Sequence, residues 1–488
     1  MKRYSRLGDE AVRAIVASSL FMAIALSLLA QTRPTTANIP FSEADPILTE
    51  LDEILPAELK GKSSAQRSAI WPNWVVGRDR DIRARLVQGD EDSLVNLIIF
   101  GTSYTSQPRL TARQVAQIGK GGSTGAQPDE DARLARILNT RIDDLIKGAA
   151  GKTNNERLLF ARSILSERKR INLLTASGAT QARNYLLASI DRVLKESAAY
   201  TKILEQAKLL GDPTEEFSER SRLFSTRGLS SDTSLLPEFA LEESLKAMRD
   251  RKLINAGQIR RVAIVGPGLD FTDKEEGYDF YPLQTIQPFA ILDSLSRLGL
   301  AEPGSVQMTT LDLSPRVNGH LSHARQEAAR GQGYMLQLPR SVQAGWKPEA
   351  VSYWAHFGDH IGMPTSPIPV PSAAGNLAIR AVRVRPDVVL RITPTDLNIV
   401  LQRMELPESQ RFDLIIGTNI FIYYDVFEQA LCLRNVEQML RPGGLLLTNN
   451  ALLELPSSRM HSIDYLTVVY SDRPDDGDHI VWYQRAAN

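Results

Sequence analysis

Residues 260–271, RRVAIVGPGLDF, decide the predicted fold of the second half of the chain. An unbroken apolar run at 262–265 leads directly into Gly266 and Gly268. A short apolar run that ends in glycines is typical of a buried strand in a parallel sheet. Glycines at that point let backbone N–H groups approach a ligand closely, because no Cβ stands in the way. The stretch therefore predicts a strand and a glycine turn that binds a nucleotide-like cofactor.

Strands and helices alternate from residue 258 onward. We expect strands at 261–265, 306–311, 388–393, 412–417 and 445–448, with helices at 237–251, 286–298, 319–329 and 426–440. Two alternating runs, 465–470 and 479–484, flank a polar loop and end the chain as a hairpin. The pattern predicts an α/β fold for 237–488, a Rossmann-like and mostly parallel sheet with a terminal antiparallel hairpin.

Polar residues follow four of these strands. Gly266 and Gly268 follow the first strand, Asp312 follows the second, and Asp396 lies three residues past the third. The fourth strand and its loop read FDLIIGTNIFIYYD at 412–425. Right-handed crossovers bring the carboxyl ends of parallel strands to one edge, where ligands bind. A carboxylate after strand two can accept ribose hydroxyls, and one after strand three can accept an adenine amino group.

This order of motifs resembles the class I S-adenosylmethionine-dependent methyltransferases over roughly residues 237–488. LRPGGLLLTN at 440–449 is similar to their segment leading into strand five, and LDLSPRV at 311–317 to their acidic turn after strand two. The strand-four stretch also resembles the chemotaxis-receptor glutamate methyltransferases. The resemblance implies an S-adenosylmethionine cofactor and methyl transfer to an unidentified small-molecule or protein acceptor.

Site residues follow from the same resemblance. Gly266 and Gly268 would line the methionine moiety, Asp312 would hold the ribose, and Asp396 with Leu397 would hold the adenine. Asp270 stands at the position of the family's third glycine. We expect Asp270 either to line the cofactor site or to mark a site that has lost its cofactor.

Two insertions lengthen the α/β region, at 272–287 and at 333–376. Each could form a substrate lid or a packing loop, because long ordered loops in a compact domain are often functional. The catalytic candidates are His356, His360, Asn419 and Tyr423, since a neutral nucleophile needs a proton acceptor and a shaped pocket. A structural role is the competing interpretation for each, and Asp425 could cap the following helix.

Composition excludes several classes of function. The chain has 488 residues, with 57 Lys+Arg and 57 Asp+Glu, so no net charge favours nucleic acid as a partner. A single cysteine, Cys432, excludes an intrachain disulfide and any multi-cysteine metal site. The six histidines show no zinc-binding spacing, so we expect no metal.

The N-terminus has the pattern of an export signal or a signal anchor. An uncharged run at 14–30 follows four basic residues, and cleavage could occur after Ala30 or Ala37. This predicts an exported or membrane-anchored protein; the alternative is a buried helix of a cytoplasmic protein. We therefore divide the chain into the signal segment 1–37, a mixed region 38–128, a helical region 129–236, and the α/β region 237–488.

Two other functions remain open on the sequence alone. A nicotinamide-dependent oxidoreductase is compatible with the glycine turn and an acidic second strand, although the missing third glycine and the terminal hairpin argue against it. A non-catalytic exported protein that retains the fold is compatible with the signal segment, because S-adenosylmethionine is made in the cytoplasm.

Overall fold

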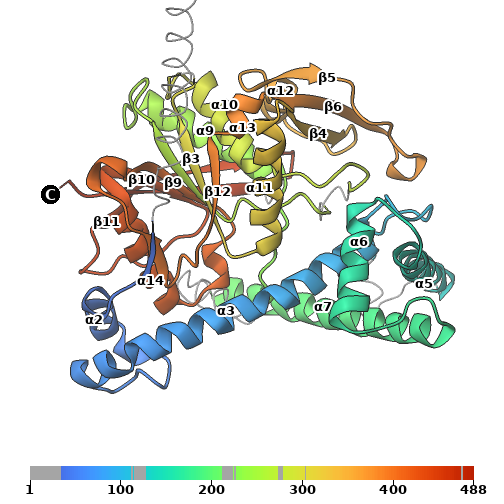
Figure 1. The fold of residues 1–488 in the computed structure, drawn as a ribbon, viewed down its shortest axis with the longest axis horizontal. Helices are drawn as coiled ribbons and strands as arrows, with labels where there is room; N and C mark the ends of the chain where they lie inside the picture. The colour runs from blue at the N-terminus through green and yellow to red at the C-terminus, as the bar shows by residue number, and fades with distance from the viewer. Residues whose placement is uncertain are drawn as a thin grey trace, which may run out of the picture.

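The computed structural model describes residues 35–111, 114, 128–210, 224, 227–272, 278–302, 304–473 and 476–487. Among these residues the largest sheet has seven strands (Figure 1). They are β2 (Arg261–Val265), β3 (Gln307–Asp312), β7 (Ile392–Asp396), β9 (Phe412–Gly417), β10 (Leu440–Thr448), β11 (Met460–Val469) and β12 (Gly477–Arg485). Their order across the sheet is β11-β12-β10-β9-β2-β3-β7.

The direction of these strands confirms the predicted fold class. Strands β7, β3, β2, β9 and β10 pair in parallel. Strand β12 pairs antiparallel with both β10 and β11. The result is a mostly parallel, Rossmann-like sheet that ends in an antiparallel pair.

Helices cover both faces of the sheet. Alternate residues of a strand point to opposite faces, so one strand contributes side chains to two cores. Val262 and Ile264 belong to a core with α9 (Leu236–Asp250), α10 (Gln287–Arg297), α11 (Pro315–Ala329) and α12 (Pro348–His356). Ala263 and Val265 belong to a second core with α2 (Phe41–Glu50), α14 (Val426–Met439) and the first part of α3 (Ser64–Phe100). A fully buried strand of this kind explains the unbroken apolar run.

Helix α3 is 37 residues long and joins two cores. Trp71, Val75 and Ile82 pack with the sheet, whereas residues from Leu94 to Phe100 pack in a third core. That third core contains α5 (Pro128–Ala150), α6 (Glu156–Arg162), the π-helix η2 (Ser163–Arg168) and α7 (Ala176–Leu210). Figure 1 shows α3 running from the sheet to this helical region. Residues 38–100 therefore have no separate core of their own.

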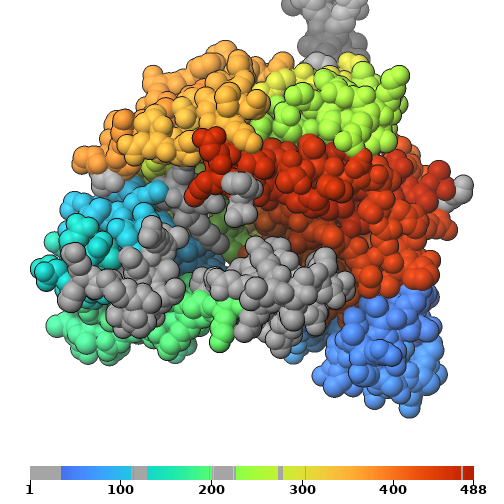
Figure 2. Space-filling model, turned by 180° about the vertical axis from the view of Figure 1, so that it is seen from behind, coloured from blue at the N-terminus to red at the C-terminus, as the bar shows by residue number. Residues whose placement is uncertain are grey.

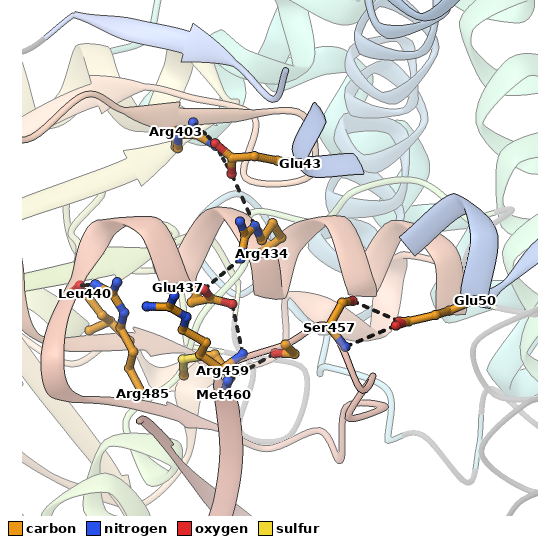
Figure 3. Close-up of polar contacts among 11 residues, drawn as sticks. Glu43, Glu50, Arg403, Arg434, Glu437, Leu440, Ser457, Arg459, Met460 and Arg485 are labelled. Carbon is orange, nitrogen blue, oxygen red and sulfur yellow. Dashed lines mark hydrogen bonds and ion pairs between the residues drawn. The ribbon is translucent and has the colours of Figure 1, made fainter. Parts of the chain in front are cut away.

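The first described residues are fastened to the α/β region. Strand β1 (Thr36–Asn38) pairs antiparallel with β8 (Gln402–Met404). Glu43 of α2 accepts hydrogen bonds from Arg403 at 2.7 and 3.0 Å and from Arg434 at 3.2 Å (Figure 3). From behind, the N-terminal segment forms a lobe against the C-terminal part of the chain (Figure 2).

Two expected elements differ in the structure. The apolar pair at 388–389 lies in the short helix α13 (Pro386–Val389), which begins at a proline, and the third strand of the sheet starts only at Ile392. Proline suits the first turn of a helix because a backbone N–H at that position would have no acceptor within the helix, so no hydrogen bond is lost. The fifth strand, expected at 445–448, begins five residues earlier, because residues 441–444 (RPGG) are part of β10. The pairing of β10 with β9 shifts register between Leu440 and Leu445.

The second insertion is an ordered subdomain. Strands β4 (Tyr334–Ser341), β5 (Gly362–Thr365) and β6 (Leu377–Val384) form a three-stranded sheet in the order β4-β6-β5. Leu336, Leu338 and Val382 pack into the core beside α10 and α11. The run at 14–30 lies outside the described residues, and no helix among those that are described is long and apolar enough to cross a membrane.

Candidate active site at the carboxyl edge of the sheet

A cavity of about 430 Å³ lies at the carboxyl ends of β2, β3, β7 and β9. Clefts of this size are usual for cofactors and drug-sized ligands. Its walls come from the glycine turn, the ends of the next strands, the strand-four loop and the segment before α9. The lining includes Gly266, Gly268, Asp312, Leu313, Leu397, Ile399, Thr418, Asn419, Ile420, Tyr423 and Tyr424.

The glycine turn leaves no room for side chains. Gly266 and Gly268 have φ of +67° and +66°, a conformation that other residues rarely adopt. A Cβ on Gly266 would lie 2.1 Å from Cδ1 of Ile420, and one on Gly268 would lie 2.8 Å from the Ser231 carbonyl oxygen. The Gly266 N–H donates to the Leu311 carbonyl at 2.9 Å, which ties the turn to the end of β3. The predicted turn is thus packed closely against the strand-four loop, the segment before α9 and the end of β3.

Asp312 ends β3 and lines the cavity. Its Oδ1 accepts a hydrogen bond from the Ser314 N–H at 2.7 Å. Burial raises the pKa of Asp312 to about 7, against the lowering effects of the Ser314 N–H, of Arg316 and of the Gly268 N–H. A carboxyl in this state can accept hydroxyl hydrogen bonds and changes charge near neutral pH.

Three further polar side chains form a chain along the cavity wall. Gln287 Nε2 donates to Glu238 Oε1 and to Thr418 Oγ1, both at 2.9 Å. Glu238 is only 1% exposed, and burial raises the pKa of its carboxyl well above the ordinary value. No motif in the sequence marks Glu238 or Gln287, because each lies near the start of a helix among apolar residues.

The structure does not bring Asp396 or Asp270 into the cavity. Asp396 ends β7 and is exposed, and it forms an ion pair with Arg83 of α3 at 2.8 Å. Asp270 is 4% exposed, and its Oδ2 accepts hydrogen bonds from Tyr281 and Gln284, both at 2.8 Å. Neither carboxylate lines this cavity. That Asp396 holds the adenine, and that Asp270 lines the cofactor site, stay predictions.

Only two of the four catalytic candidates lie at the cavity. Asn419 and Tyr423 line it, and Asn419 is held at φ +57° by hydrogen bonds with Asn449. His356 and His360 lie exposed at the end of α12 and just after it. Neither histidine lines the cavity, since the second insertion packs on the helices beside the sheet. That insertion is therefore not a lid over this cavity.

Asp425 caps α14, which is the structural role that the sequence indicated for it. Its side chain accepts a hydrogen bond from the Glu428 N–H at 2.8 Å, and the Glu428 side chain accepts one from the Asp425 N–H at 3.2 Å. This reciprocal pair fixes the start of the helix that follows the strand-four loop.

One wall of the cavity comes from the polar segment 229–234, which the sequence did not assign to the site. The Leu269 N–H donates to the Ser231 carbonyl at 2.6 Å, and the Thr233 N–H donates to the Leu269 carbonyl at 3.1 Å. Asp232 accepts hydrogen bonds from Ser93 and Asn96 of α3. The only sequence signal was a serine-rich stretch before a helix, which indicates a loop but not its place.

Residues that precede the α/β region also contribute to the cavity. Leu86 of α3 and Phe224 line it, and Phe224 packs edge-on against Tyr423 with ring centroids 5.7 Å apart. Arg85 donates to the carbonyl oxygens of Phe224 at 2.9 Å and Tyr423 at 2.8 Å. The site is therefore shared between the α/β region and the chain that precedes it.

Comparisons with known proteins were made by family model, by sequence and by structure. No protein-family model and no curated protein matches the chain. Among solved structures, TrmN from Thermus thermophilus is 14% identical over 51% of this chain and 52% of its own, with a TM-score of 0.23. DesVI from Streptomyces venezuelae is 9% identical over 51% of this chain and 64% of its own, with a TM-score of 0.20.

A third match extends over more of the chain. Human N-acetylserotonin methyltransferase, solved in complex with S-adenosylmethionine, is 10% identical over 89% of this chain and 100% of its own, with a TM-score of 0.24. The chain thus spans about half of TrmN and under two thirds of DesVI. Scores and identities of this size carry no argument about activity, which has to come from the residues of the cavity.

Proposed function

We propose that the chain binds S-adenosylmethionine in this cavity and transfers its methyl group to a small-molecule or protein acceptor. The convergence of Gly266, Gly268 and Asp312 on one cavity carries the proposal. The family resemblance assigns these three residues to the cofactor, and each of them faces the same space. A dinucleotide-binding enzyme is less well supported, because the third glycine is replaced by a carboxylate held by Tyr281 and Gln284.

The residues of the cavity fit the parts of that cofactor. The two glycines leave backbone space for the amino-acid end, and Asp312 offers a carboxylate to the ribose hydroxyls. Leu313, Leu397 and Ile399 supply an apolar surface for the adenine, without the carboxylate of Asp396. When bound, S-adenosylmethionine would supply an electrophilic methyl group.

The protein's own contribution would be alignment and proton management. Tyr423 and Asn419 lie on the strand-four loop, where they can hold an acceptor beside the cavity. Holding two reactants in the reactive pose can lower a barrier by ~7–11 kcal/mol. Glu238, buried in the same wall, can exchange a proton with a bound group.

Calorimetric titration of the full chain tests the proposal. S-adenosylmethionine and NAD are titrated separately, and we expect saturable binding of the first and none of the second. Asp312→Ala should abolish or strongly weaken the binding. NAD binding without S-adenosylmethionine binding would show an oxidoreductase, and unchanged affinity in Asp312→Ala would refute the site.

A non-catalytic role is the second candidate, and the Arg83–Asp396 ion pair is the observation that favours it. This pair engages one of the carboxylates that the resemblance assigns to the cofactor. A protein that has lost its cofactor should bind neither nucleotide in the same titrations. Arg83→Ala frees the Asp396 carboxylate from its ion pair, and the same titrations of this variant would show whether that restores cofactor binding.

A further inference from the structure

Glu238 is a buried carboxyl with one oxygen left over for a ligand. Its Oε1 accepts the hydrogen bond from Gln287, whereas Oε2 has no hydrogen-bond partner in the part of the chain that the structure describes. The residue is 1% exposed and lines the cavity. An unpartnered buried carboxyl oxygen is costly, so one that persists calls for a partner outside the chain, such as a ligand or an ordered water.

The surroundings of Glu238 contain acids and neutral groups. Asp478 of β12 is the charged group that raises its pKa after burial itself. The buried phenols of Tyr353 and Tyr470 lie near enough for Glu238 to raise their pKa values in turn. No Arg, Lys or His among the described residues forms an ion pair with Glu238 or stabilises its charge in the pKa balance. The position is thus complementary to a cation.

Neighbouring polar groups fix the direction of this carboxyl. Gln287 Nε2 bridges Glu238 Oε1 and Thr418 Oγ1, which leaves Oε2 as the acceptor that remains. Glu238 lies in the first turn of α9, where the helix dipole favours a negative charge. A cationic hydrogen-bond donor that reaches this wall of the cavity would therefore find an oriented acceptor on α9.

We propose that Glu238, oriented by Gln287 and Thr418, forms a subsite for a primary ammonium group of a ligand. The inference rests on the proposed function. Two ligands would carry such a group there, namely the amino-acid end of S-adenosylmethionine or an amine-bearing methyl acceptor. The shared chemistry is an ammonium ion that donates to Oε2.

Ammonium binding at this carboxyl has a thermodynamic signature. The free carboxyl holds its proton to a higher pH than an ordinary glutamate, because burial disfavours the charge. A bound ammonium group favours the ionised form, so binding should release a proton. Asp312, whose pKa is raised to about 7, should also release a proton when it accepts ribose hydroxyls. Ligands with and without an ammonium group separate the two contributions.

The experiment measures binding heats of the full chain at about pH 6.5 in two buffers of different ionisation enthalpy, which gives the protons released per ligand. The probes are S-adenosylhomocysteine, which carries an amino group, 5′-methylthioadenosine, which does not, and propylamine added to protein saturated with S-adenosylhomocysteine. Glu238→Gln removes the charge and keeps the shape. The control is Glu242→Gln, one turn later on α9, whose buried carboxylate is already paired with Ser294 and Arg297.

The outcomes identify the source of the ammonium group. We expect Glu238→Gln to weaken S-adenosylhomocysteine binding about 10- to 100-fold and to remove its extra proton release, with 5′-methylthioadenosine unaffected. That result would assign the subsite to the cofactor's amino-acid end. If both nucleosides instead behave alike, Glu238-dependent binding of propylamine would assign it to the methyl acceptor.

Other results would overturn the inference. Unchanged affinity and proton release in Glu238→Gln for every probe would do so, as would an equal loss in Glu242→Gln. If neither nucleoside binds the wild-type chain, the proposed function fails by itself. Propylamine titration of the free protein then decides the subsite alone, with Glu238-dependent binding supporting it and no binding overturning it.

Discussion

Asp312 is a carboxyl whose environment opposes its charge, and this sets a pH dependence. Its pKa is raised to about 7 in the folded protein by burial, compared with an ordinary 3.8. The folded state therefore binds the proton more tightly than the unfolded chain does. The stabilisation from this proton is complete below about pH 4 and is lost as the pH rises to about 7.

Asp312→Asn should therefore separate stability from binding. We expect the free energy of unfolding of the variant to exceed that of the wild type at about pH 8 by on the order of 1–3 kcal/mol, with the difference shrinking toward pH 4. In the wild type we expect the affinity for S-adenosylmethionine to rise between about pH 6 and 8, as Asp312 loses its proton. In Asp312→Asn the affinity should be lower and should not depend on pH in this range. Urea unfolding and calorimetry at several pH values measure both effects. A constant stability difference across this range would contradict the prediction.

Gly266 tests the close approach at the turn. Gly266→Ala places a Cβ 2.1 Å from Ile420 in a backbone with φ of +67°, so we expect weaker cofactor binding and a loss of at least about 1 kcal/mol in stability. Gly299→Ala is the matched control, because Gly299 has φ of +66° and no heavy atom within 4 Å of the added Cβ. Thermal unfolding should show that both variants are less stable than the wild type, because both place a Cβ on a backbone with positive φ. Cofactor titration should show weaker binding only for Gly266→Ala.

The sequence predicted those cavity residues whose position depends only on the order of the strands. Gly266, Gly268 and Asp312 lie directly at strand ends, so strand order alone brings them together. Asp396 also ends a strand, but Arg83 of a helix more than 300 positions earlier binds its side chain, and no local pattern announces that partner. Glu238 was missed for the same reason, because its role depends on contacts with Gln287 and the cavity wall.

At the scale of elements, α2 is held by one carboxylate between two arginines. Glu43→Gln leaves Arg403 and Arg434 without that charge in a partly buried seam, and we expect a loss of about 1–3 kcal/mol in the free energy of unfolding. Glu50→Gln on the same helix is the control, since Glu50 is exposed and contacts only Ser457 among the bonds shown in Figure 3. Equal effects of the two substitutions in urea unfolding would argue against this seam.

Elements with strong apolar patterns were predictable, and those set by tertiary contacts were not. The expected strands at 261–265 and 412–417 have the bounds that were predicted, since each contains a run of at least three apolar residues. The run at 388–389 has the same composition but follows a proline and forms a helix. The continuity of α3 across 37 residues could not be foreseen, because its two ends pack in different cores.

At the scale of the whole molecule, the position of β1 bears on the proposed export signal. Strand β1 pairs with β8 through Thr36, Ala37 and Asn38. Cleavage after Ala30 would leave this pairing whole, whereas cleavage after Ala37 would remove two of its residues. We propose that an exported form begins at Gln31, which N-terminal sequencing of the protein purified from its host would show.

Two results would contradict this proposal. A start at Asn38 would mean that the pairing of β1 is dispensable. A retained Met1 would favour an anchor or a cytoplasmic protein, and a reporter fused to the C-terminus would then show which side of the membrane the protein occupies. Export would also require a source of S-adenosylmethionine outside the cytoplasm.

Segment 229–234 forms backbone hydrogen bonds with the residue after the glycine turn, and this limits which fragments of the protein can fold. A fragment that begins at residue 237 would retain every strand of the main sheet but would lack this wall, α2 and α3. We expect that fragment to be insoluble or to bind 1-anilinonaphthalene-8-sulfonate as a loosely packed state, whereas a fragment that begins at residue 35 should fold. We therefore expect the smallest fragment that folds on its own to include the helices that precede the α/β region.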